Sequence, residues 1–394
     1  MRVAIVGGKL QGVEAAFLAG EAGWEAVLVD RKSSVPAAGL CQSFYQCDVV
    51  KDVSSLRRVI EKVDLVIPAL EDVKALGALE ECAADAHIPL AYDTSAYFIT
   101  HSKKRSNHLF ERLGVPLPQS WPECGLPLMA KPSTASGSQG VSRISTEKEL
   151  NDFVRHAGSK LGQWVLQEYL EGSFYSIEVL GWEGHYITLQ VTELEMDEHY
   201  DCRRVLAPAQ ISEPLDRQIK EMALTIAAGL DLTGIMDVEV VVSGGDIKVL
   251  EIDARLPSQT PTAVYKSTGV NMLELLRDIF VTGAKPVIPE VKTARGVVYE
   301  NIRVSPDGLQ FQGEHIMGEA GSLEAAPDFF GADMALTDFE PSSFPWVATL
   351  IIVGENREQA WLKRERVVEN IEGFLAEDRA STSSPGDIPS LSRG

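Results

Sequence analysis

The chain has 394 residues, which suits two or three domains at about 150 residues each. Apolar residues are 45% and charged residues 24%, a globular composition that excludes disordered, collagen-like and disulfide-scaffold classes. The net charge of −21 argues against nucleic acid or an anionic membrane as a partner. An anionic ligand would therefore need a few cations placed locally against this acidic background.

The five cysteines indicate no zinc site and no disulfide framework, because their number is odd and no pair has C-x-x-C spacing. No apolar run approaches the ~20 residues of a membrane span, and no signal-peptide core is present at the N-terminus. We therefore expect a cytoplasmic protein.

Short apolar runs and amphipathic stretches alternate through the first 95 residues. Strands are predicted at 3–8, 26–30 and 64–70, with a helix at 13–23. This pattern is typical of a parallel sheet covered by helices, which binds ligands at the carboxyl ends of its strands. Those ends carry Lys9, Leu10, Gln11, Asp30 and Glu71.

The first strand-to-helix turn resembles a dinucleotide fingerprint but lacks one of its glycines. In GGKLQG the second glycine of G-x-G-x-x-G is replaced by Lys9, whose side chain obstructs a close pyrophosphate approach. A dehydrogenase is therefore disfavoured. Lys9 either meets a phosphate or carboxylate at the helix N-terminus or is a solvated surface lysine.

Residues 128–145 are predicted to form a strand, a loop of small residues and a second strand. The loop, STASGSQG, has free N–H groups that can wrap phosphate oxygens. Lys131 ends the first strand and would face this flap.

A hairpin is predicted at 234–257, turned by Ser-Gly-Gly-Asp at 243–246. Alternation places Asp237 and Glu239 on one face of its first strand. Glu251, Asp253 and Arg255 lie on one face of its second strand. Four packed carboxylates would repel one another unless a cation neutralises them, and oxygen-only ligands favour Mg²⁺. A solvent-facing acidic hairpin is the alternative, but the opposite face is apolar.

These parts fit transfer of the γ-phosphoryl group of ATP to a carboxylate, followed by attack of an amine on the acyl carbon. Such chemistry depends on positioning, Mg²⁺ and cationic clamps rather than on a protein nucleophile. Arg255 would stabilise the developing negative charge.

The order of these segments resembles the ATP-grasp ligases, and most closely those of pyrrolysine biosynthesis. The shared segments are VGGKLQG at 6–12, HYDC at 199–202, GIMDVE at 234–239 and EIDARLPSQTPTAVY at 251–265. The resemblance extends from the first residue to about 375. It implies an α/β and α+β chain: an ATP-grasp fold with a Rossmann-like domain before it.

The resemblance also implies a reaction. The carboxylate of (3R)-3-methyl-D-ornithine is activated as an acyl phosphate and joined to the ε-amine of L-lysine, giving 3-methylornithinyl-lysine. D-ornithine is expected to act as a surrogate substrate. ATP and Mg²⁺, as two ions, are the implied cofactors, and the oligomeric state stays open. The alternatives are another ATP-grasp ligase for diamino acids and a non-catalytic nucleotide-binding protein; the intact acidic hairpin argues against the latter.

Site residues are carried over from the family by position. Arg255 and Lys131 are expected to be catalytic, and Glu239, Glu251 and Asp253 to hold the metal. The expected ATP residues are Lys9, Asp30, Asp48, Val49, Lys103, Lys131, Ser136, Gly137, Ser138, Gln167, Glu168, Tyr169 and Leu170. L-Lysine is expected at Leu10, Gln11, Glu71 and Glu300, and methylornithine at Asp237, Arg255, Ser258, Gln259, Thr260 and Thr262. The ribose ligand stays open between Glu171 and Glu178.

The resemblance implies three parts and a tail. They are an N-terminal domain on the lysine side at 1–95, an ATP-grasp domain at 96–285 and a C-terminal part at 286–375. Residues 376–394 are rich in Ser, Pro and Gly and are predicted to be a disordered tail.

Overall fold

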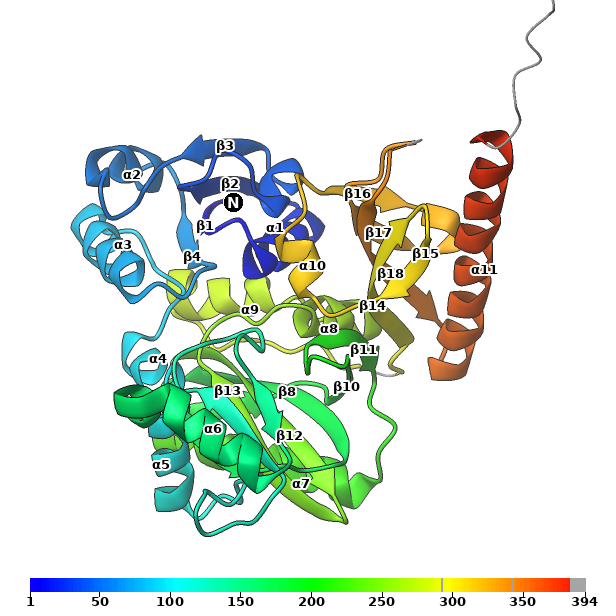
Figure 1. The fold of residues 1–394 in the computed structure, drawn as a ribbon. Coiled ribbons are helices and arrows are strands. Elements are labelled where there is room, and N and C mark those ends of the chain that lie inside the picture. Colours follow the sequence, from blue (N-terminus) through cyan, green and yellow to red (C-terminus); the bar gives the residue numbers. More distant parts are fainter. Residues whose placement is uncertain (292, 342, 383–394) are drawn as a thin grey trace, which may run out of the picture.

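The computed structural model describes residues 1–291, 293–341 and 343–382. Within these ranges no helix combines the length and the apolar character needed to cross a membrane. The N-terminal domain, the central ATP-grasp region and the C-terminal part surround α8 (Thr260–Thr268) and α9 (Met272–Arg277) (Figure 1).

The N-terminal domain has a four-stranded parallel sheet in the order β3-β2-β1-β4, which confirms the predicted α/β class. Its elements are β1 (Arg2–Val6), α1 (Leu10–Glu21), β2 (Glu25–Asp30), β3 (Ser43–Gln46), α2 (Val53–Ile60), β4 (Leu65–Pro68) and α3 (Val73–Ala86). Gly7 turns the chain from β1 into α1 at φ +108°, and a Cβ there would lie 2.2 Å from the Ala69 carbonyl oxygen. Glycine is required because of both constraints.

A small antiparallel sheet, β6-β5-β7, carries the flap between its first two strands. It consists of β5 (Leu128–Pro132), β6 (Ser142–Ile144) and β7 (Trp164–Glu168), with α6 (Glu147–Ala157) in the connection. Two helices, α4 (Thr94–Thr100) and α5 (Lys103–Leu113), join it to the N-terminal domain. The predicted strand–loop–strand arrangement is confirmed.

One eleven-stranded sheet runs through the rest of the chain, with its main path β13-β12-β8-β10-β11-β14-β18-β17-β16. Its strands are β8 (Ser173–Trp182), β9 (His185–Thr188), β10 (Thr192–Met196), β11 (Cys202–Ala207), β12 (Gly234–Ser243), β13 (Asp246–Asp253), β14 (Gly296–Ser305), β15 (Gly308–Phe311), β16 (Glu324–Pro327), β17 (Met334–Thr337) and β18 (Trp346–Gly354). Its helices include α7 (Glu213–Leu230), α10 (His315–Gly318) and α11 (Arg357–Thr382). Short helical turns lie at Pro36–Leu40, Gly158–Gln163, Asp278–Thr282 and Phe329–Gly331.

The sheet does not divide at the boundary expected at residue 285, because β14 pairs directly with β11. The ATP-grasp region and the C-terminal part are therefore one continuous sheet. The tail expected from 376 begins inside α11, which continues to Thr382; residues 383–394 lie outside the described ranges.

Candidate active site

Strands β12 and β13 form the predicted acidic hairpin. Their register pairs Asp237 with Asp253 and Glu239 with Glu251, with an irregularity after Glu239. Since alternate residues share a face, the four carboxylates lie on one surface. Val238 and Ile252 on the other face are fully buried. The sequence prediction of this arrangement is confirmed.

Three carboxylates of this hairpin, those of Asp237, Glu239 and Asp253, have raised pKa values. Burial, together with the charges of Glu251 and Asp253, raises the pKa of Glu239 to about 7. Burial also raises the pKa of Asp253 to about 7, although Arg255 opposes the shift, and it raises the pKa of Asp237 well above its usual value. A bound cation would stabilise the ionised forms of these carboxylates.

The predicted metal ligands Glu239, Glu251 and Asp253 fit Mg²⁺. They offer only oxygen donors, and the charge of Glu251 helps to raise the pKa of both Glu239 and Asp253. Glu251 accepts a hydrogen bond from the Lys103 ammonium. Burial works against the charge on Lys103, but Glu251 and its acidic neighbours raise the pKa of this lysine above its usual value.

We expect Mg²⁺ to stabilise the protein more at about pH 8 than at about pH 6. The pKa values of Glu239 and Asp253 are raised to about 7 in the folded protein. Without metal, these two acids therefore contribute to the free energy of unfolding fully below their ordinary pKa, and this contribution is lost as the pH rises through about 7. Mg²⁺ needs ionised ligands and offsets this loss only above that pH. Thermal unfolding with and without Mg²⁺ at the two pH values measures the difference. An equal rise in melting temperature on adding Mg²⁺ at both pH values would contradict this expectation.

A cavity of about 100 Å³, here called the hinge cavity, lies between the small sheet and the acidic hairpin. Seven of the predicted ATP residues line it: Lys103, Lys131, Ser138, Gln167, Glu168, Tyr169 and Leu170. Burial lowers the pKa of Lys131 here. The volume is well below the ~300 Å³ of small ligand pockets, so a nucleotide enters only if the walls move.

The flap is the wall that closes this cavity. The Lys103 ammonium donates to the Ala135 carbonyl at 2.7 Å, and the Ser138 hydroxyl donates to the Tyr200 carbonyl at 2.6 Å. The Ser136 hydroxyl donates to the Glu71 carboxylate of the N-terminal domain. A nucleotide has to break or rearrange these few contacts.

A larger cavity of about 480 Å³, the N-terminal cavity, lies at the carboxyl ends of β1, β2 and β4. It is lined by Lys9, Leu10, Gln11, Asp30, Asp48, Val49, Glu71, Ser136, Gly137, Arg255, Ser258 and Glu314, among others. The hinge cavity and this one share no lining residue. Six predicted ATP residues therefore line this cavity and the other seven line the hinge cavity; the six are Lys9, Asp30, Asp48, Val49, Ser136 and Gly137.

An inner cavity of about 120 Å³ connects the two. It shares Tyr200, Glu239 and Glu251 with the hinge cavity, and Ser136, Arg255 and Glu314 with the N-terminal cavity. The three cavities therefore adjoin one another, and residues of the acidic hairpin line the hinge and inner cavities.

Arg255 lies where the N-terminal cavity meets the acidic hairpin. Its guanidinium pairs with Glu71 at 2.7 Å and with Asp253 at 2.9 Å. Gln11 donates to the same Glu71 carboxylate at 2.8 Å. Arg255 and Glu71, predicted for different substrates, are therefore direct neighbours.

The segment 258–262 contributes Ser258, Gln259 and Thr260 to the lining of the inner cavity. The Ser258 hydroxyl and the Gln259 side-chain amide donate to Glu314 at 2.7 and 2.8 Å. Several buried oxygens here have no hydrogen-bond partner among the described residues: those of Thr260, Thr262, Gln259 (Oε1) and Asp237 (Oδ1). Unpartnered buried polar atoms are costly, and a polar ligand would satisfy them.

Glu178 was left open as a ribose ligand, but it lies beside Asp237 instead. The two residues are direct partners across β8 and β12. Glu178 is fully buried, and among the described residues its carboxylate makes no well-formed hydrogen bond, although the Thr260 hydroxyl is near enough to oppose the rise in its pKa. Burial raises its pKa to about 7. Neither Glu178 nor the exposed Glu171 lines the hinge cavity as it stands.

Glu300, which was predicted to bind L-lysine, lines none of the three cavities. It is fully buried in β14 and pairs with Arg204 and Arg364. A carboxylate buried this deeply needs such partners. Glu314 lines both the inner and the N-terminal cavity, and burial raises its pKa to about 6. No sequence pattern marked Glu314.

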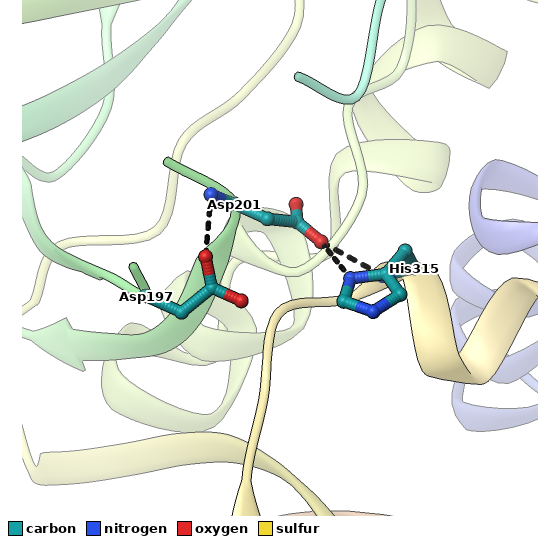
Figure 2. Close-up of side chains that lie close together, drawn as sticks. All are labelled: Asp197, Asp201 and His315. Atoms are coloured by element: carbon teal, nitrogen blue, oxygen red, sulfur yellow. Dashed lines mark hydrogen bonds and ion pairs between the residues drawn. The ribbon is translucent and has the colours of Figure 1, made fainter. Parts of the chain in front are cut away.

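Asp197, Asp201 and His315 are, within the described ranges, a group whose ligand atoms come within 4.8 Å of one another. Figure 2 shows the His315 ring facing the Asp201 carboxylate, at 2.6 Å, while Asp197 accepts from the Asp201 backbone N–H. Asp197 also accepts from the backbone N–H groups of His199 and Gly313. The carboxylates of Asp197 and Asp201 already accept hydrogen bonds within the protein. The group therefore connects the loop that precedes β11 to α10.

Comparison with known proteins places this geometry in a family. A model of the ATP-grasp domain matches residues 100–259. A protein from Methanosarcina barkeri named 3-methyl-D-ornithine–L-lysine ligase is 35% identical over 366 residues, covering 92% of this chain and 95% of the relative. A protein of the same name from Methanosarcina acetivorans is 33% identical, with the same coverage.

Solved structures agree on the fold. A biotin carboxylase from Campylobacter jejuni superposes with a TM-score of 0.73 at 14% identity, over 97% of this chain and 96% of that chain. N5-carboxyaminoimidazole ribonucleotide synthetase from Thermus thermophilus gives 0.67 at 19% identity, over 93% and 98%. The fold is therefore the expected one. The chain belongs to the ATP-grasp ligases and, within them, to the family of 3-methyl-D-ornithine–L-lysine ligases.

Proposed function

We propose that this protein joins the carboxylate of (3R)-3-methyl-D-ornithine to the ε-amine of L-lysine at the expense of ATP. The carboxylate oxygen attacks the γ-phosphorus and ADP leaves. The ε-amine nitrogen then attacks the acyl carbon, phosphate leaves and the nitrogen loses a proton. Three adjoining cavities, two of them lined by the acidic hairpin, are the observation that carries this proposal.

We assign ATP to the hinge cavity and L-lysine to the N-terminal cavity, with methylornithine in the inner cavity between them. Lys103 and Lys131 supply the local cations that phosphates need in a chain of charge −21. Glu239, Glu251 and Asp253 would hold Mg²⁺, as two ions, which neutralises phosphate charge. Arg255 would stabilise the charge that develops on the reacting oxygens, because it lies where the inner and N-terminal cavities meet.

The lysine site combines Leu10, Gln11 and Glu71 with Glu314, which takes the role first expected of Glu300. The carboxylates of Glu71 and Glu314 suit a basic amino acid. We place the reaction in the cytoplasm, and the five cysteines, all free, are consistent with a reducing compartment.

The direct test incubates the full chain with Mg²⁺, ATP, D-ornithine and L-lysine. We expect release of ADP and an amide product whose mass equals the two amino acids less one water. If ADP appears only with another diamino acid pair, a different diamino-acid ligase is indicated. If no ADP forms with any pair, the ligase assignment is wrong.

We further propose that Asp237, which lines the inner cavity, binds the terminal ammonium of methylornithine, and that Glu178, its neighbour outside the cavity lining, adds a second negative charge beside it. Both are buried side by side, and Asp237 keeps an oxygen without a hydrogen-bond partner among the described residues, so a bound ammonium would offset the cost of burying these two carboxylates. The Glu178→Gln variant should raise the KM for D-ornithine roughly 10- to 100-fold. D-norvaline lacks that ammonium, so its KM should rise much less. The ratio of kcat/KM for D-ornithine to kcat/KM for D-norvaline should therefore fall.

Steady-state kinetics with both amino acids check this prediction. Glu183→Gln is the matched control, because Glu183 follows the same strand but is exposed. An equal loss for D-ornithine and D-norvaline would contradict the assignment and place the α-ammonium at Glu178.

A further inference from the structure

Glu14, in the second turn of α1, is a buried carboxylate that none of the assigned roles uses. It is 1% exposed and lines none of the three cavities. Its two oxygens accept hydrogen bonds from the backbone N–H groups of Gln259, at 3.2 Å, and Thr262. A residue of the N-terminal domain therefore holds the backbone of the segment assigned to methylornithine.

The two amides belong to the start of α8. Gln259 precedes this helix, and its own side chain makes no capping hydrogen bond. Free N–H groups at a helix start are normally satisfied by such a cap. Glu14 supplies the missing acceptor from another domain, and its negative charge suits the positive end of the helix dipole.

Gln259 has an unusual backbone that needs this support. Its φ of +71° lies in the left-handed region, which is unfavourable for a residue with a side chain. The conformation directs its side-chain amide to Glu314 and to the Cys202 carbonyl, at 2.8 and 3.2 Å. Without an acceptor at its N–H, the segment would lose a contact that fixes this geometry.

Helix α1, which carries Glu14, also carries two residues of the proposed lysine site in its first turn. Leu10 and Gln11 occupy the first turn of α1 and line the N-terminal cavity, and Glu14 follows one turn later. We propose that Glu14 is a positioning residue that fixes the 258–262 segment, so that α1 keeps the methylornithine and lysine sites in register. This inference rests on the proposed function.

The test replaces Glu14 with glutamine in the full chain. The amide NH₂ cannot accept a hydrogen bond, so one of the two backbone N–H groups is left without a partner. Glu14→Asp is the second variant, since it keeps the charge but is too short to reach both amides. Glu21→Gln is the matched control: Glu21 lies on the same helix and pairs with Lys266 of α8, away from the segment.

Two measurements are compared. Hydrogen–deuterium exchange of peptides covering 256–265 should become faster in Glu14→Gln, less so in Glu14→Asp, and unchanged in Glu21→Gln. The KM for D-ornithine should rise at least about tenfold in Glu14→Gln, equivalent to about 1.4 kcal/mol, while the KM for ATP stays within about twofold.

The outcomes separate the two proposals. Unchanged exchange in Glu14→Gln, or KM values for all three substrates that rise together, would overturn the positioning role. If the wild type and Glu21→Gln make no amide, the ligase proposal fails, while the exchange comparison still decides whether Glu14 holds the segment.

Discussion

Glu251→Ala is expected to abolish amide formation, with a fall of at least about 10³-fold in kcat/KM, while the protein stays folded. The substitution removes one of the three oxygen ligands proposed for Mg²⁺ and the partner of the Lys103 ammonium. The Mg²⁺-induced rise in melting temperature should shrink with it. Turnover by mass spectrometry and thermal unfolding with Mg²⁺ measure the two effects.

The control for this variant is Glu193→Ala. The Glu193 side chain is 27% exposed and pairs with Arg357, against 28% for Glu251 paired with Lys103. A loss of surface ion pairing alone would affect both variants equally. Full activity in Glu251→Ala would mean that the metal site is misplaced.

Arg255→Ala should lower kcat roughly 10²- to 10³-fold, the range found when one preorganised donor to a developing negative charge is removed. The KM for ATP should change little, because Arg255 does not line the hinge cavity. Removing the guanidinium also leaves Glu71 and Asp253 without their cation, so some stability will be lost. Arg255→Lys keeps a charge there but not the planar fork, and should recover stability more than kcat.

Arg357→Lys and Arg357→Ala are the matched controls for Arg255. The Arg357 side chain is 14% exposed and pairs with Glu193, against 13% for Arg255. We expect these controls to keep kcat within about twofold. Unchanged kcat in Arg255→Ala, with a normal melting temperature, would remove Arg255 from the reaction.

The acidic hairpin shows what local pattern can predict. Strand alternation placed Asp237, Glu239, Glu251 and Asp253 on one face, and the pairing across the turn confirms it. The flap and the parallel sheet were readable for the same reason: their signals lie in contiguous residues. Family resemblance then indicated which of the charged residues belong to the reaction.

Tertiary structure decided which distant residues meet. Glu300 and Glu314 are both glutamates near the end of the chain, yet one is neutralised by Arg204 and Arg364 and the other lines two cavities. Glu178 could be placed beside Asp237 only once the pairing of β8 with β12 was known. Lys9 and Asp30 were assigned to ATP by position, but the structure separates them from the hinge cavity.

The sequence by itself determined the fold class, the acidic hairpin with its nearby cations and the family, because all of these are written in local periodicity and contiguous motifs. Only the tertiary structure decided how the site is divided into three cavities, which acids are buried without partners, and that Glu14 of one domain holds the 258–262 segment of another. Such contacts join residues up to 248 positions apart, and no local pattern records them.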